Sequence, residues 1–183
     1  MGLFLLAGAA GALPTNAQAP QALVASQPRY SLTLTGYNAV PGQTDDTPFV
    51  TASGAYTNPE VVAARSQDLK DELPFGTIIA ITGPSTKSGT CGYGAVSDTI
   101  GYRVIADTMN VRYANRIDVV FGTKDRYLLP DGRTMNAASL LGVCTGVSVQ
   151  VVGFVDISNP NKLPKTQADV VAIVERGNQL AIK

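Results

Sequence analysis

The chain has 183 residues, of which 45% are apolar and 15% charged, and 14 basic side chains balance 14 acidic ones. This length supplies one domain with its own core. The balanced charge disfavours a nucleic-acid partner, because phosphate binding needs a basic patch. The sequence contains no histidine, so the commonest general base and the commonest metal ligand are missing. We therefore expect no metal site and no cofactor.

The N-terminal segment has the features of a targeting sequence. Gly2–Leu13 is an uncharged apolar run of signal-peptide length, followed by small residues that suit cleavage. The basic residues that usually precede such a run are missing, and the alternative is a buried or membrane-associated apolar segment. We expect residues 1–19 to be a signal peptide or anchor and residues 20–29 a linker. The protein would then be exported to the periplasm, cell envelope or exterior, with any membrane association made through the N-terminus.

The first half of the remaining chain predicts short strands separated by turns. Tyr30–Tyr37 alternates with period two, which is typical of a half-buried strand. Val40–Pro48 is rich in turn-forming residues and includes an acidic pair without the spacing of a calcium loop. Phe49–Ser53 predicts a short strand, Val61–Arg65 is an apolar run, and Ser66–Glu72 fits a helical turn.

The second half supplies the remaining elements. Strands are expected at Thr77–Thr82, Tyr102–Ala106, Ile117–Phe121 and Val147–Val152, and a short helix at Asn136–Gly142. A long loop should lead to Ile100, and a charged loop to Arg133. Six to seven short strands with one or two short helices predict an all-β barrel over residues 30–154. Residues 155–183 form a C-terminal extension, in which Thr166–Val174 fits either a strand or an amphipathic helix.

Two cysteines are placed where a disulfide could form. Cys91 lies in a glycine-rich loop, and Cys144 precedes the last predicted strand. In an oxidising compartment we expect a Cys91–Cys144 bridge, which would close a loop of ~50 residues and stabilise the fold by ~4 kcal/mol. The alternative is two free thiols in a reducing cytosol.

Two aspartates belong to strand-like runs: Asp107 stands at the end of the predicted strand Tyr102–Ala106, and Asp118 lies within Ile117–Phe121. Strict alternation places Asp107 on the face of Arg103, and turns Asp118 away from its two apolar neighbours. Aspartate is disfavoured in strands, so some interaction should compensate for each. The compensation could be structural, through turn amides or through pairing with Arg112 or Arg116, or it could be functional.

The order of several motifs resembles that of a known family. They span residues 31–153 and comprise Thr35-Gly-Tyr37, Thr51-Ala-Ser-Gly54, Leu73-Pro-Phe-Gly-Thr77, and the two runs carrying Asp107 and Asp118. Together they resemble the 3D domain, named for three aspartates, a double-psi β-barrel related to membrane-bound lytic transglycosylase A. Arg65 occupies the position of the third aspartate, and the nearby Asp68 does not fit the spacing.

The resemblance implies a protein that acts on peptidoglycan glycan strands. It assigns Asp118 as the catalytic acid/base, assisted by Asp107, in a cleavage between N-acetylmuramic acid and N-acetylglucosamine that uses no water. One carboxyl group can serve such a lyase, whereas ordinary glycosidases need two. Candidate substrate contacts are Thr35, Tyr37, Thr51, Ser53 and Asn110; the first four could equally be ordinary strand and turn residues.

Two other functions remain open at this stage. The missing third aspartate favours a non-catalytic, expansin-like module that binds wall glycan. A structural protein of the envelope, with the barrel but no working groove, is a further alternative. The motif Leu73–Thr77 is expected to be structural in each case.

Overall fold

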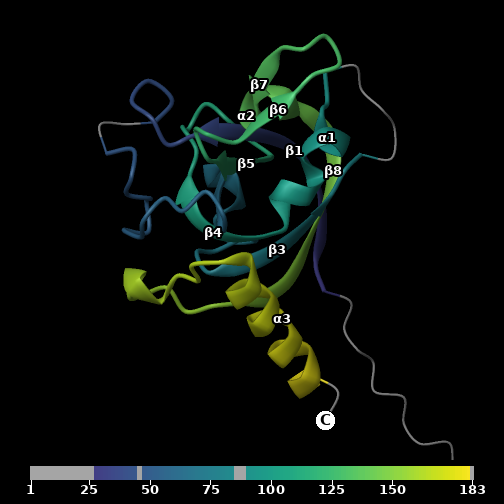
Figure 1. Cartoon of the computed structure of the whole chain (residues 1–183). Helices are drawn as coiled ribbons and strands as arrows, with labels where there is room; N and C mark the ends of the chain where they lie inside the picture. The colour runs from purple at the N-terminus through teal and green to yellow at the C-terminus, as the bar shows by residue number, and fades with distance from the viewer. Residues whose placement is uncertain (1–26, 45–46, 85–89, 182–183) are drawn as a thin grey trace, which may run out of the picture.

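A computed structural model describes residues 27–44, 47–84 and 90–181. Its centre is a closed barrel of six strands in the order β1-β5-β2-β4-β3-β8 (Figure 1), which confirms the predicted all-β barrel. In that order the strands are Arg29–Asn38, Arg116–Phe121, Val62–Arg65, Tyr102–Thr108, Thr77–Thr82 and Cys144–Phe154. The predicted signal peptide or anchor, most of the linker and the acidic pair at 45–46 lie outside the described ranges.

The barrel interior is filled by alternate residues of the six strands. Every strand contributes at least one buried apolar side chain, namely Leu32, Leu34, Ala63, Ile79, Ile81, Ile105, Ile117, Val119, Phe121, Val147 and Val149. Period-two alternation produces this arrangement because successive side chains point to opposite faces of a strand. The side chains between these residues therefore face the outside of the barrel wall.

Two helices and a hairpin cover one end of the barrel. Helix α2, Ala137–Leu141, is the helix expected from the sequence; Asn136 caps its first turn and Gly142 ends it with a φ of 62°. Helix α1, Tyr93–Ile100, lies in the segment predicted as a loop, and it packs Val96 and Ile100 into the barrel core. The loop prediction was wrong because the glycine-rich start of this segment conceals a short apolar i, i+4 pair. Strands β6, Arg126–Leu128, and β7, Thr134–Asn136, form a hairpin in the predicted charged loop.

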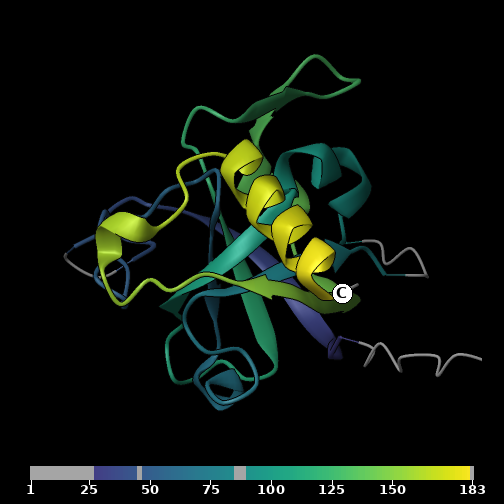
Figure 2. The same cartoon turned by 90° about the horizontal axis from the view of Figure 1, so that it is seen from below.

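The C-terminal extension covers the outer wall of the barrel. After a 3₁₀ turn, η2 at Pro160–Lys162, helix α3 runs from Gln167 to Ala181 and lies beneath the barrel (Figure 1, Figure 2). Val170 and Val174 are buried against a second apolar cluster on this outer face. The choice between strand and helix is thereby settled as a helix. Within the described ranges, none of the helices has both the length and the apolar character needed to cross a membrane.

Residues 49–53 do not form the predicted strand. They are turns, with a single β-bridge between Val50 and Tyr56. The Thr51 hydroxyl accepts a hydrogen bond from the Ala55 amide at 3.1 Å, and Gly54 has a φ of 82°. This local turn closes the chain on itself, so the backbone cannot join the barrel ladder.

Two turns between β2 and β3 fall on segments for which the sequence predicts a helical turn and a structural motif. Residues Gln67–Leu69 form a 3₁₀ turn, η1, where a helical turn was expected. Gly76 in the Leu73–Thr77 motif has a φ of 94°, and its amide donates to the Ile105 carbonyl at 2.8 Å. A side chain at this position would strike the Val155 carbonyl. Glycine is therefore required for the turn that enters β3.

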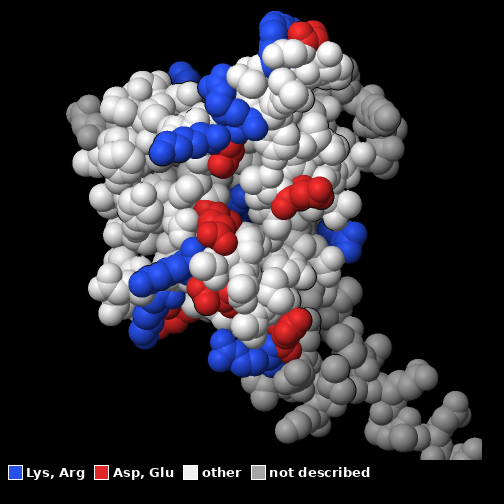
Figure 3. Space-filling model, in the orientation of Figure 1, with Lys and Arg blue, Asp and Glu red and all other residues white. Residues whose placement is uncertain are grey.

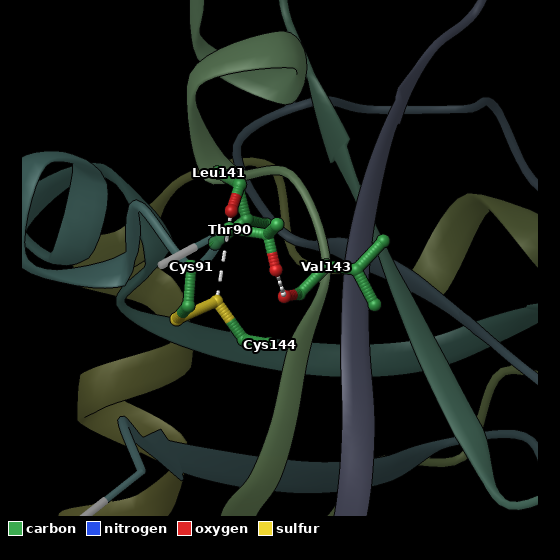
Figure 4. The surroundings of a disulfide bond; sticks show 5 residues. All are labelled: Thr90, Cys91, Leu141, Val143 and Cys144. Carbon is green, nitrogen blue, oxygen red and sulfur yellow. Dashed lines mark hydrogen bonds between the residues drawn. A yellow bond between two sulfur atoms is a disulfide. The ribbon is translucent and has the colours of Figure 1, made fainter. Parts of the chain in front are cut away.

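The two cysteines form a disulfide. Cys91 and Cys144 are joined across 53 positions of the sequence, linking the segment before α1 to the start of β8 (Figure 4). The predicted bridge is confirmed, and it fastens α1 to the end of the barrel closed by α2.

The surface carries both signs of charge, interspersed over the face seen in Figure 3.

Candidate functional site

A cavity of about 600 Å³ opens on the outer wall of the barrel. Its floor contains Asp107 and Asp118, which come from β4 and β5. Three groups of residues line it: the floor residues Tyr37, Ala64, Asp107 and Asp118; the β1–β2 connection residues Gly42, Gln43, Thr44, Thr47, Pro48 and Val50; and the β4–β5 residues Thr108, Met109, Asn110, Arg112 and Tyr113. The cavity is thus a cleft between two loops, with the paired aspartates at its base.

The barrel topology brings the two aspartates together. Strand β2 lies between β4 and β5, and Ala64 of β2 is the ladder partner of both Asp107 and Asp118. Because alanine is small, it leaves room between the two carboxyl groups. The aspartates, which are separated by a ten-residue segment in the sequence, therefore face one cavity.

A β-bulge accounts for the orientation of Asp107. The register of β2 on β4 shifts between Ala63 and Ala64, so that Ala63 pairs with Ile105 and Ala64 with Asp107. One residue of β4 is therefore left without a ladder partner, and the strand rotates locally. Alternation placed Asp107 on the face of Arg103, which was wrong; the bulge turns its carboxyl toward the cavity. Sequence alternation alone contains no signal for such a bulge.

The Asp118 carboxyl is half-buried and retains its proton more readily than an ordinary aspartate. Burial raises its pKa, while a 3.0 Å hydrogen bond from the Thr35 hydroxyl and the charge of Arg116 oppose the rise, and Asp107 adds to it. The net result is a pKa of about 6. At mildly acidic to neutral pH both protonation states of Asp118 are populated. A side chain that first donates a proton and then accepts one needs both states.

The Asp107 carboxylate is held by three donors. The Tyr37 hydroxyl donates to Oδ2 at 3.0 Å, and the backbone amides of Ala52 and Thr108 donate to Oδ1 at 2.8 Å each. Burial, followed by the Asp107 charge, raises the pKa of Tyr37 well above its usual range. The tyrosine therefore stays protonated and keeps donating. The two aspartates sit in different environments, which is how a pair of carboxyl groups acquires different roles.

The candidate substrate contacts divide into two groups. Tyr37 and Asn110 line the cavity. Thr35, Thr51 and Ser53 do not line it: Thr35 holds Asp118, and the hydroxyls of Thr51 and Ser53 lie 2.9 Å apart in the turn that presents the Ala52 amide to Asp107. These three residues therefore position the aspartates and do not face the cavity themselves.

Arg65, which stands where the resembled family has its third aspartate, is not part of the cavity lining. Its side chain is buried, donates to the carbonyls of Leu73 and Ser66, and lies 5.2 Å from the centre of the Phe75 ring. Arg65 therefore fixes the segment between β2 and β3. With an arginine at this position, Asp107, Asp118 and their hydrogen-bond partners are in place.

Sequence reasoning missed the β1–β2 connection and Arg112 as parts of the site. The sequence predicts only turns for the connection, although surface loops commonly supply binding residues. Arg112 was considered only as a partner for an aspartate. Its position two residues after Asn110, a candidate substrate contact, was the available signal.

The chemistry available to the site is that of two carboxyl groups and a tyrosine hydroxyl. Among the described residues, no group of three or more aspartate, glutamate or cysteine side chains is placed to hold a metal ion. Comparisons of the chain with family models, curated proteins and solved structures found no match. Assignment of a function therefore depends on the motifs and on this geometry.

Proposed function

We propose that this protein is an exported lytic transglycosylase-like enzyme of the cell envelope, which cleaves peptidoglycan between N-acetylmuramic acid and N-acetylglucosamine. The observation that carries the proposal is the half-buried Asp118 carboxyl, with a pKa of about 6, at the base of a cleft. The motif resemblance supplies the substrate class. The disulfide supports export, because such bonds persist mainly in oxidising compartments.

In the first step, protonated Asp118 donates its proton to the glycosidic oxygen as the bond from the anomeric carbon to that oxygen breaks. The N-acetylglucosamine hydroxyl leaves, and positive charge develops at the anomeric carbon of the muramic acid residue. The Asp107 side chain, fixed by its three donors, stabilises this charge electrostatically.

In the second step, the C6 hydroxyl of the same muramic acid residue attacks the anomeric carbon. Its proton passes to the Asp118 carboxylate, which returns to its starting state, and the product is a 1,6-anhydro sugar. No water is consumed. A single carboxyl group whose pKa lies near the working pH can serve both steps.

Digestion of purified peptidoglycan by the oxidised protein tests this proposal. Wild-type protein should release soluble glycan fragments, and Asp118→Asn should release none, since an amide cannot transfer the proton. Asp98→Asn is the matched control, because Asp98 is exposed on α1 and does not line the cavity. Release by Asp118→Asn at the wild-type rate would refute the assignment.

A non-catalytic glycan-binding module remains the second candidate. The observation that favours it is Arg65, which replaces the third aspartate of the resembled family and makes structural contacts only. In the same assay such a module would stay bound to the wall material and release nothing.

A further inference from the structure

Two arginines flank a tyrosine at the edge of the cavity: Arg112 and Tyr113 lie in the loop between β4 and β5, and Arg116 is the first residue of β5. The guanidinium carbons of Arg112 and Arg116 each lie 4.8 Å from the centre of the Tyr113 ring, within the range of a cation–π interaction. Arg112 and Tyr113 line the cavity, whereas Arg116 does not. Two positive charges are therefore held at Tyr113, and the charge of Arg116 acts on Asp118.

Arg112 is held in place with hydrogen-bonding capacity to spare. Its Nη2 donates to the Tyr113 hydroxyl at 2.9 Å, and its backbone amide donates to the Asn110 side chain at 3.1 Å. A guanidinium has five N–H groups arranged in a fork. The two hydrogens of Nη2 lie on different edges of the guanidinium, one beside Nε and the other beside Nη1. The Tyr113 hydroxyl accepts one of these hydrogens. The opposite edge of the guanidinium can therefore still donate two parallel hydrogen bonds to a ligand.

Neither arginine forms an ion pair within 4.0 Å in the described part of the chain, although the charge of Arg116 acts on Asp118 at longer range. The ion pairs found there within 4.0 Å join Arg133 to Asp131 and Lys162 to Asp156. The Nε of Arg116 is buried without a hydrogen-bond partner. Arg112 itself is exposed, so its free edge is open to a ligand in the cleft.

The charge of the site also points to an anionic ligand. Two aspartates alone would repel a negatively charged substrate, and the two guanidiniums offset that repulsion. A planar guanidinium fork matches a carboxylate by two parallel hydrogen bonds. A neutral sugar would use neither the charge nor the fork.

We infer that Arg112, braced by Tyr113, is a carboxylate-binding residue that selects glycans carrying a negatively charged group beside the bond to be cleaved. This inference rests on the proposed function and specifies its substrate. Two sources supply the same chemistry in peptidoglycan: the lactyl carboxylate of a muramic acid residue without a peptide, and a free carboxylate of the stem peptide.

Binding is measured by calorimetry with the full chain carrying Asp118→Asn, so that no ligand is consumed. Four ligands are compared: a peptide-free tetrasaccharide of alternating N-acetylglucosamine and N-acetylmuramic acid, the same compound with its lactyl carboxylates converted to methylamides, a peptide-bearing tetrasaccharide, and the latter with its peptide carboxylates amidated. Arg112→Gln, Arg112→Lys and the control Arg126→Gln are each added to the Asp118→Asn background. Arg126 is exposed on β6, outside the cavity lining, so its replacement removes the same charge elsewhere.

Arg112→Gln should weaken binding of a carboxylate-bearing ligand about 10-fold and leave its amidated counterpart unchanged. Arg112→Lys should give an intermediate loss, because it keeps the charge without the fork, and Arg126→Gln should change neither affinity. The ligand pair that responds identifies the source of the carboxylate. Equal losses for carboxylate and amide forms, or no loss for any ligand, would overturn the inference while leaving glycan binding intact. If none of the four glycans binds, the proposed function fails, and the inference fails with it.

Discussion

The Asp118 carboxyl should destabilise the folded protein at neutral pH, and Asp118→Asn should therefore make the protein more stable. The difference between a pKa of about 6 in the folded state and the ordinary value of 3.8 corresponds to about 3 kcal/mol. The folded state holds this proton more tightly than the unfolded state does. Wild-type stability is therefore lost as pH rises from about 4 to about 6, whereas the amide is insensitive to this change.

The assay is urea unfolding of the oxidised protein at pH 4 and pH 8. At pH 8, Asp118→Asn should raise the free energy of unfolding by about 3 kcal/mol, and at pH 4 by less than about 1 kcal/mol. The amide oxygen can still accept the hydrogen bond from Thr35, so little is lost in exchange. Asp98→Asn should change stability by no more than about 0.5 kcal/mol at either pH. Equal stability of wild type and Asp118→Asn at pH 8, or a gain of the same size at both pH values, would refute the reasoning.

Three further predictions concern the site and the fold. Peptidoglycan cleavage should fall about tenfold per pH unit above pH ~6, because the first step needs protonated Asp118; a rate that stays flat to pH 8 would argue against that acid. Replacing both Cys91 and Cys144 with alanine should lower the free energy of unfolding by ~4 kcal/mol, because the bridge closes a long loop; denaturation of the two proteins at the same urea concentration would contradict this. Arg103→Met should destabilise by at least about 3 kcal/mol, since the fully buried guanidinium donates to four backbone carbonyls that would lose their partner; calorimetric melting would show an unchanged transition if that account were mistaken.

The barrel was predictable because its strands obey simple alternation. In β1, apolar Leu32 and Leu34 alternate with polar residues, and Asn136 and Gly142 mark the ends of α2 by ordinary capping chemistry. The disulfide followed from the cysteine count and an expectation of export. The strands and the helix ends depend on local pattern, and the disulfide on there being only two cysteines to pair, and a sequence displays both directly.

The parts that escaped prediction depend on non-local pairing. Asp107 faces the cavity because a bulge against β2 rotates the end of β4, and nothing near Asp107 in the sequence encodes that register. Residues 49–53 have the composition of a strand, but the Thr51 hydroxyl closes a turn that competes with sheet pairing. The carboxylate-binding role proposed for Arg112 depends on its contact with Tyr113 and on its place in the cavity lining, and both are set by the fold.

The central claim is that one carboxyl group, Asp118, cleaves the glycan without water. Mass spectrometry of the fragments released from purified peptidoglycan tests it most directly. The account predicts muropeptides ending in 1,6-anhydro-muramic acid, each lighter by one water than the hydrolysis product, from wild-type protein and none from Asp118→Asn. Hydrated reducing ends from the wild type, lost or kept in the mutant, would contradict the claim.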